Sequence, residues 1–128
     1  MAENKLLYEY AVIRVVPRVE RDEFINAGLI LYCKKQDVLL CKTFLHQTKL
    51  LCLDEQADCE TIARYLEAFE RIASGNCPEN VLSKADKPAR FRWLTAAKST
   101  IIQCSPVHPG LADDVQQVFK DLCKKLVH

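Results

Sequence analysis

The feature that most restricts the fold is a pair of apolar runs separated by four polar residues. The first run, GLILYC, spans 28–33 and has the composition of a central strand, and the second run spans 38–44. The intervening KKQD has the length and polarity of a hairpin turn. The two runs therefore predict an antiparallel hairpin with one strand in the middle of a sheet.

Two further strands are expected on either side of this hairpin in the sequence. LYEYAVIRVV, residues 7–16, is rich in β-branched and aromatic residues and stops at Pro17. A charged segment follows, and residues 20–24 predict a helical turn within it. Residues 100–104 predict a fourth strand, followed by a proline-bracketed loop over 105–110.

Two amphipathic helices are predicted. From Asp54 the pattern is helical and ends at Gly75, with exposed pairs Glu60–Arg64 and Glu67–Arg71. Its inward face is expected to carry Ile62, Leu66, Phe69 and Ala73. The second helix spans 112–127 and is expected to turn inward Val115, Val118, Phe119, Leu122 and Leu126. Residues 45–53 fit either a short helix or an irregular strand, and 76–88 predict a polar loop.

The order of these elements predicts an α+β fold. Because strands and helices do not alternate in a βαβ rhythm, we expect a two-layer domain with an antiparallel or mixed sheet. The two amphipathic helices would cover one face of that sheet. The length of 128 residues is that of one ordinary domain, so a single domain is expected over 1–128.

Charge and hydropathy argue against two classes of partner. Lys and Arg number 18 against 17 Asp and Glu, so a nucleic-acid partner is not favoured, although basic residues cluster around Trp93. The longest strongly apolar stretch, 27–33, is far shorter than the ~20 residues of a membrane-spanning helix. The N-terminus lacks the basic and apolar regions of a secretory signal. We therefore expect a cytoplasmic protein without a membrane partner.

The cysteines and glycines weigh against bound metals and cofactors. The seven cysteines are odd in number, spread singly and without metal-binding spacing, so we interpret most of them as reduced packing residues. Three glycines leave almost no room for a phosphate-cradling loop or a dinucleotide fingerprint. The sequence predicts neither a metal site nor a cofactor.

The segment 88–111 concentrates the side chains that could carry function. Arg90 and Arg92 would share a face if the chain were extended, and Trp93 offers a stacking surface. The candidate anion-binding residues are Arg14, Arg90, Arg92, Lys98 and His108. The structural alternative is that the arginines stack on Trp93 or pair with acids, as Arg14 would with Glu9 or Glu23.

No catalytic residue is assigned from the sequence. Cys104 and Ser105 precede His108 by a few residues, but nucleophile and base are recognised by their geometry in the fold and not by sequence proximity. Neither a nucleophile elbow nor paired carboxylates are present.

The stretches YEYAVIRVVPRVERDEFINAGLILYC and RFRWLTAAKSTIIQCSPVHPGL resemble the bacterial family described as domain of unknown function 3037. The resemblance spans nearly the whole chain and implies one compact domain, without implying an activity or functional residues. In the family pattern a Pro-Arg pair often stands where this chain has Ala97 and Lys98, and proline where it has Cys104. A lysine in place of arginine favours a point charge over bidentate anion recognition.

Two functions from different classes remain. The first is a non-catalytic interaction or regulatory domain that binds a protein partner and accepts an anionic group among its basic residues. The second is a small enzyme, or a binder of phosphate or carboxylate, built on the same residues. Both require the basic residues to share a site, and that idea fails if Arg92 and His108 point to opposite surfaces.

Overall fold

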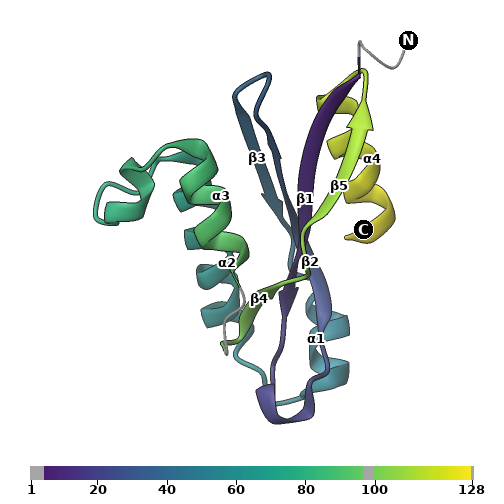
Figure 1. Ribbon diagram of the computed structural model, residues 1–128. Helices are drawn as coiled ribbons and strands as arrows, with labels where there is room; N and C mark the ends of the chain where they lie inside the picture. Colours follow the sequence, from purple (N-terminus) through teal and green to yellow (C-terminus); the bar gives the residue numbers. More distant parts are fainter. Residues whose placement is uncertain (1–4, 97–99, 128) are drawn as a thin grey trace.

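The computed structural model describes residues 5–96 and 100–127, which form a five-stranded sheet surrounded by helices (Figure 1). All strand pairs in these ranges are antiparallel, in the order β3-β2-β1-β4, and β5 also pairs with β1. The strands are β1 (Leu6–Val15), β2 (Ile25–Cys33), β3 (Val38–Thr43), β4 (Ile102–Cys104) and β5 (His108–Ala112). The α+β class and the antiparallel sheet predicted from the sequence are confirmed.

The hairpin of β2 and β3 forms as predicted. β2 lies between β1 and β3, and of its residues only Asn26 is not fully buried. The KKQD turn is closed by the Asp37 N–H, which donates to the Lys34 carbonyl at 3.1 Å. Asp37 adopts a left-handed φ of 54°, which aspartate tolerates better than most residues. The central strand is therefore fixed by local sequence.

The far edge of β1 is shared by two short strands. β4 pairs with Ile13–Val15, and β5 pairs with Leu6–Tyr10. The predicted loop over 105–110 is thus wrong in its second half, because His108 already belongs to β5. Pro109 fits there since β5 is an edge strand, where a missing N–H is tolerated.

Helices cover both faces of the sheet. On one face Ala11, Ile13 and Val15 of β1 pack with α2 (Cys59–Ser74) and α3 (Lys87–Thr95). On the other face Tyr10 and Val12 pack with α4 (Val115–Leu126), and Figure 1 shows α4 across the sheet from α2 and α3. The expectation that both amphipathic helices lie on one face is wrong, because alternating residues of β1 are apolar on both sides.

The helices begin and end at recognisable caps. The Asp58 side chain accepts from the Thr61 N–H at the start of α2, and Gly75 with φ 80° ends it as predicted. Arg71 pairs with Glu79 at 3.5 Å and not with Glu67 as expected. The ambiguous stretch is α1 (Gln47–Leu53), with Leu50 fully buried.

The predicted loop over 76–88 is partly helical. A 3-10 helix, η3 (Val81–Lys84), lies within it, and α3 begins at Lys87. The Asp86 carboxylate accepts from the Ala89 N–H, and Pro88 occupies the first turn, where its missing N–H costs no hydrogen bond. This helix was not predicted from the sequence, and it replaces the extended form in which Arg90 and Arg92 would have shared a face.

Two glycines allow a comparison of backbone and side-chain crowding. A Cβ on Gly28 would lie 2.6 Å from the Lys42 carbonyl oxygen, which β3 holds in place, whereas a Cβ on Gly110 would meet the Tyr8 ring. We expect Gly28→Ala to lower the free energy of unfolding by about 1–3 kcal/mol, and Gly110→Ala by clearly less because the end of the Tyr8 side chain can shift as a whole. Urea denaturation followed by circular dichroism measures both, and an unchanged stability of Gly28→Ala would contradict this packing.

Candidate functional site

The predicted anion-binding residues lie in separate places. Arg14 is in β1, Arg90 and Arg92 are in α3, and His108 is in β5. Lys98 lies outside the described residues. The helical form of α3 alone separates its two arginines, since residues two apart on an α-helix point about 200° away from each other.

Arg90 fastens three segments together. Its Nε donates to the Ala73 carbonyl at 3.2 Å, and its Nη1 donates to the Ala85 carbonyl. Ala73 is in the last turn of α2, and Ala85 is the residue that ends η3. A guanidinium group at a helix C-terminus also complements the helix dipole. Arg90 therefore has a structural role, although its partners are backbone carbonyls and not the Trp93 ring or an acid as the structural alternative had it.

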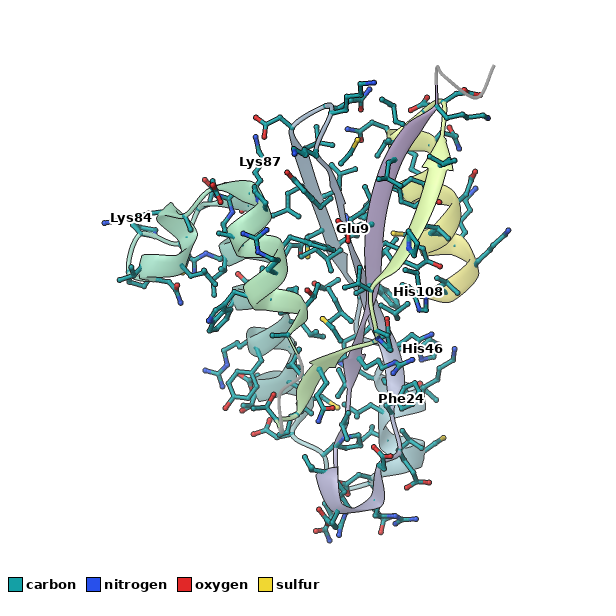
Figure 2. The ribbon with its side chains drawn as sticks, viewed as in Figure 1. Glu9, Phe24, His46, Lys84, Lys87 and His108 are labelled. Carbon is teal, nitrogen blue, oxygen red and sulfur yellow. The ribbon has the colours of Figure 1, made fainter. Side chains whose placement is uncertain are left out.

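Arg92 and His108 lie on opposite faces of the sheet. Arg92 lines a cleft with Glu9 and Tyr32, on the face that α3 covers. His108 stands opposite Tyr10 in the β1–β5 ladder, with the two rings 5.4 Å apart, on the face that α4 covers. Figure 2 shows Glu9 and His108 on these two sides. A site shared by Arg92 and His108 is therefore not formed.

The Arg92 cleft carries both signs of charge. It has a volume of about 350 Å³, and Lys34 lines it together with Glu9 and Arg92. Tyr32 contributes its buried ring, and burial raises the pKa of its hydroxyl, with the nearby Asp37 charge adding to the rise. The negative charge of Glu9 offsets part of the positive charge of Lys34 and Arg92, so this cleft should bind a simple anion only weakly.

Arg14 is held by an aromatic ring and not by an acid. Its guanidinium carbon lies 4.1 Å from the centre of the Phe24 ring, a cation–π contact. Glu23, one of its predicted partners, pairs instead with Arg21 at 2.9 Å. The Nε of Arg14 is buried and has no hydrogen-bond acceptor among the described residues.

Ser105 lies between β4 and β5 and continues their hydrogen bonding to β1. Its Oγ accepts from the Val12 N–H at 2.9 Å and donates to the Pro106 carbonyl, and its own N–H donates to the Val12 carbonyl at 2.8 Å. The side chain is buried, with an exposed fraction of 2%. The hydroxyl therefore substitutes for a backbone partner where the chain leaves the sheet, and the nucleophile interpretation loses its support.

None of the cysteines, all of which lie in the described part of the chain, forms a disulfide. Burial raises the pKa of Cys41 well above its usual value and also raises that of Cys123, which keeps both protonated at neutral pH. Within 5–96 and 100–127, no group of three His, Cys, Asp or Glu side chains could hold a metal ion. In the same ranges no helix has the length and apolar content needed to cross a membrane.

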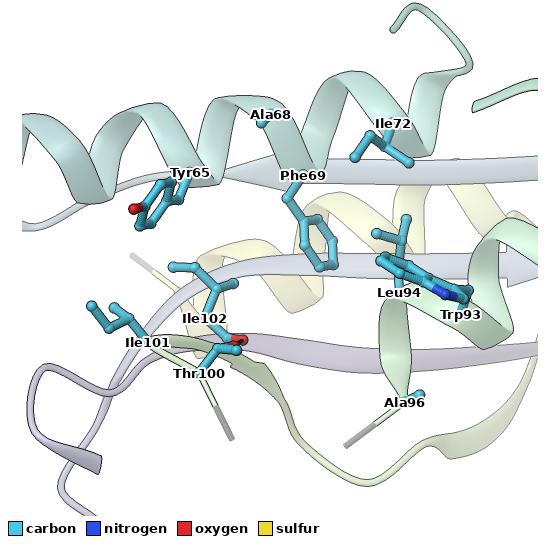
Figure 3. Close-up of a pocket in the computed structure, with 10 residues that line it drawn as sticks. All are labelled: Tyr65, Ala68, Phe69, Ile72, Trp93, Leu94, Ala96, Thr100, Ile101 and Ile102. Atoms are coloured by element: carbon cyan, nitrogen blue, oxygen red, sulfur yellow. Dashed lines mark hydrogen bonds between the residues drawn. The ribbon is translucent and has the colours of Figure 1, made fainter. Parts of the chain in front are cut away.

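An apolar groove lies between α2, α3 and the start of β4, and we call it the aromatic groove. Figure 3 shows α2 on one side, the turn of α3 with Trp93 and Leu94 on another, and the segment around Ile102 opposite. Its volume is about 520 Å³. Its lining residues are Tyr65, Ala68, Phe69, Ile72, Trp93, Leu94, Ala96, Thr100, Ile101 and Ile102.

Among the residues that the structure describes, the lining of the aromatic groove contains no charged side chain. Tyr65 and Trp93 are each 51% exposed, while Phe69 and Leu94 are more deeply buried and pack against the core. A surface of this kind gains free energy by burying apolar groups and offers nothing to a phosphate or carboxylate.

Sequence reasoning did not find this groove, although it singled out Trp93 and Phe69 separately. The groove forms where the α3 helix packs beside α2, and the sequence analysis did not predict a helix there. The pattern Asp86-Lys87-Pro88 is a helix start signal that could have revealed α3.

Comparison with known proteins gives a family but no activity. A family model described as "Protein of unknown function (DUF3037)" matches residues 10–127, which confirms the resemblance in the sequence. No curated protein and no solved structure matches the chain.

The ladder role of Ser105 predicts a cost in stability. Ser105→Ala should lower the free energy of unfolding by about 1–3 kcal/mol, because it leaves the buried Val12 N–H without an acceptor. Ser74→Ala is the control, since its exposed hydroxyl should contribute within about 0.5 kcal/mol. Chemical denaturation measures the free energy of unfolding of both variants. Equal stabilities would contradict the proposed hydrogen-bonding role of Ser105.

The two arginines of α3 should behave differently. Arg90→Ala removes two charged hydrogen bonds to carbonyls and should cost about 1.5–3 kcal/mol of stability. Arg92→Ala removes an exposed side chain and should change stability by less than about 0.5 kcal/mol. Thermal and urea unfolding test this, and a larger loss for Arg92→Ala would show that the assignment is reversed.

Proposed function

We propose that this chain, which belongs to the DUF3037 family, is a non-catalytic interaction domain whose aromatic groove receives apolar side chains of a protein partner. The observation that carries the proposal is the position of Tyr65 and Trp93, half-exposed around an uncharged groove. Exposed aromatic side chains beside a buried apolar floor are typical of surfaces that bind proteins.

The scarcity of polar groups in the lining of the aromatic groove favours a protein partner over a small-molecule ligand. Small-molecule sites bury most of the ligand and fix it with a few convergent polar groups. Among the described lining residues of the aromatic groove, the polar side-chain groups are the Thr100 and Tyr65 hydroxyls and the Trp93 indole. An amphipathic segment could insert one or two large apolar residues and leave its polar face in solvent.

The anion-accepting role predicted for the basic residues is supported unequally. Arg92 is exposed and forms no ion pair in the described part of the chain, so it can contact an acidic residue of a partner. Arg14 retains one buried nitrogen without an acceptor among the described residues. Arg90 is committed to the carbonyls of Ala73 and Ala85. We propose Arg92 as a peripheral contact and not as part of an anion pocket.

A small apolar ligand is the second candidate function. The volume of about 520 Å³ would hold one, and an uncharged lining suits it. The enzyme alternative has less support, because Ser105 belongs to the ladder and the basic residues do not converge. The cysteines of the described chain form no disulfide, which favours a reducing, cytoplasmic setting.

The test begins with affinity purification of the tagged protein from its host at native levels, followed by calorimetric titration of each purified candidate partner. Tyr65→Ala and Trp93→Ala should each weaken a genuine partner at least tenfold, because central aromatic residues dominate such interfaces. Val81→Ala is the matched control, since Val81 is 85% exposed in η3 and lines no part of the groove.

Two results would overturn this function. Equal affinity of Tyr65→Ala, Trp93→Ala and Val81→Ala for every partner would show that proteins bind elsewhere. Saturable binding of a small apolar metabolite that shifts the fluorescence of Trp93, the single tryptophan, without any protein partner would establish the second candidate instead.

A further inference from the structure

The second feature that the fold leaves open is the outer edge of β3. β3 is the terminal strand of the sheet, with β2 on its inner side, and no strand of the described chain pairs with its outer side. An open strand edge presents backbone N–H and C=O groups to any extended chain that approaches it.

The hydrogen-bond pattern shows which residues face outward. The Phe44 N–H donates to the Ala27 carbonyl at 2.7 Å, just beyond the β2–β3 ladder. Because hydrogen-bonded pairs alternate along an antiparallel ladder, Lys42 and Leu40 also bond to β2. The N–H and C=O groups of Leu39, Cys41 and Thr43 then point away from the sheet.

A groove with a basic rim runs along this edge, between β3 and α4. It has a volume of about 770 Å³. Its apolar floor is formed by Leu40, Phe119 and Cys123, and its charged residues are Lys42, Lys120 and Lys124. None of the three lysines forms an ion pair within 5–96 and 100–127, and no acidic residue lines the groove.

We propose that the β3 edge binds an extended acidic segment of a partner protein, which adds to the sheet as a further strand. The backbone of the segment would pair with Leu39, Cys41 and Thr43, and every second side chain would project over the groove. Acidic side chains there meet the lysines, and an apolar one meets Leu40 and Phe119.

Charge also decides between this partner and a second copy of the chain. Pairing of two β3 edges would bring Lys42 and its neighbours Lys120 and Lys124 from both copies into one groove region, where like charges repel. Lysine on an edge strand is a common means of preventing self-association. The lysines therefore disfavour pairing of two β3 edges and favour the binding of an acidic segment.

This site is independent of the aromatic groove. The two share no lining residue, and they lie on opposite faces of the sheet, with α2 and α3 on one side and α4 on the other. Failure of one proposal leaves the other standing.

The test uses a fluorescein-labelled peptide, Thr-Val-Thr-Glu repeated three times, in which valine and glutamate alternate on one face of a strand. We expect saturable binding by fluorescence anisotropy, at least tenfold weaker for the double variant K120E/K124E and for a peptide with glutamine in place of glutamate. Lys84→Glu is the control for a charge reversal elsewhere on the surface, because Lys84 lies in η3, away from this groove (Figure 2).

Hydrogen exchange supplies the second readout. On addition of the glutamate peptide, the amides of Leu39, Cys41 and Thr43 should become protected, which simple charge attraction would not produce. The proposal is overturned if the peptide does not bind, if K120E/K124E and Lys84→Glu bind it equally, or if those amides stay unprotected. Tighter binding of a single-stranded oligonucleotide without that protection would assign the lysines to nucleic acid instead.

Discussion

The arrangement of the whole molecule depends on the pairing of β1 with β2, because both strands are apolar on both faces. Ile13 and Val15 of β1 need cover from one side, and Val12 needs cover from the other. The hydrophobic effect therefore places α2 and α3 on the first face and α4 on the second. The aromatic groove lies on the first face and the groove between β3 and α4 on the second.

Elements with a strong local pattern could be predicted from the sequence. The hairpin of β2 and β3, the α2 helix with its Gly75 stop, and the α4 helix all follow from periodicity and turn chemistry within a few residues. β5 could not, because Pro109 resembles a loop residue and only pairing with β1, about one hundred residues earlier, makes it a strand. The face that each helix covers is likewise a property of long-range packing.

The candidate site was predicted less well for the same reason. Arg90, Arg92 and His108 are close in sequence, but the turn of α3 separates the first two, and the sheet separates Arg92 from His108. The aromatic groove combines α2 with residues about thirty positions later, so that Trp93 and Phe69 could be noticed beforehand only as separate residues. Proximity along the chain was a poor guide to proximity in the fold.

The central claim is that the chain acts by contact through the aromatic groove. The most direct measurement is an NMR chemical-shift map of the isotope-labelled protein with its partner bound. The account predicts large shifts for the Trp93 indole N–H and for Tyr65, Phe69 and Ile102, which line the groove. Shifts confined to residues remote from the groove, with the Trp93 indole unchanged, would contradict it.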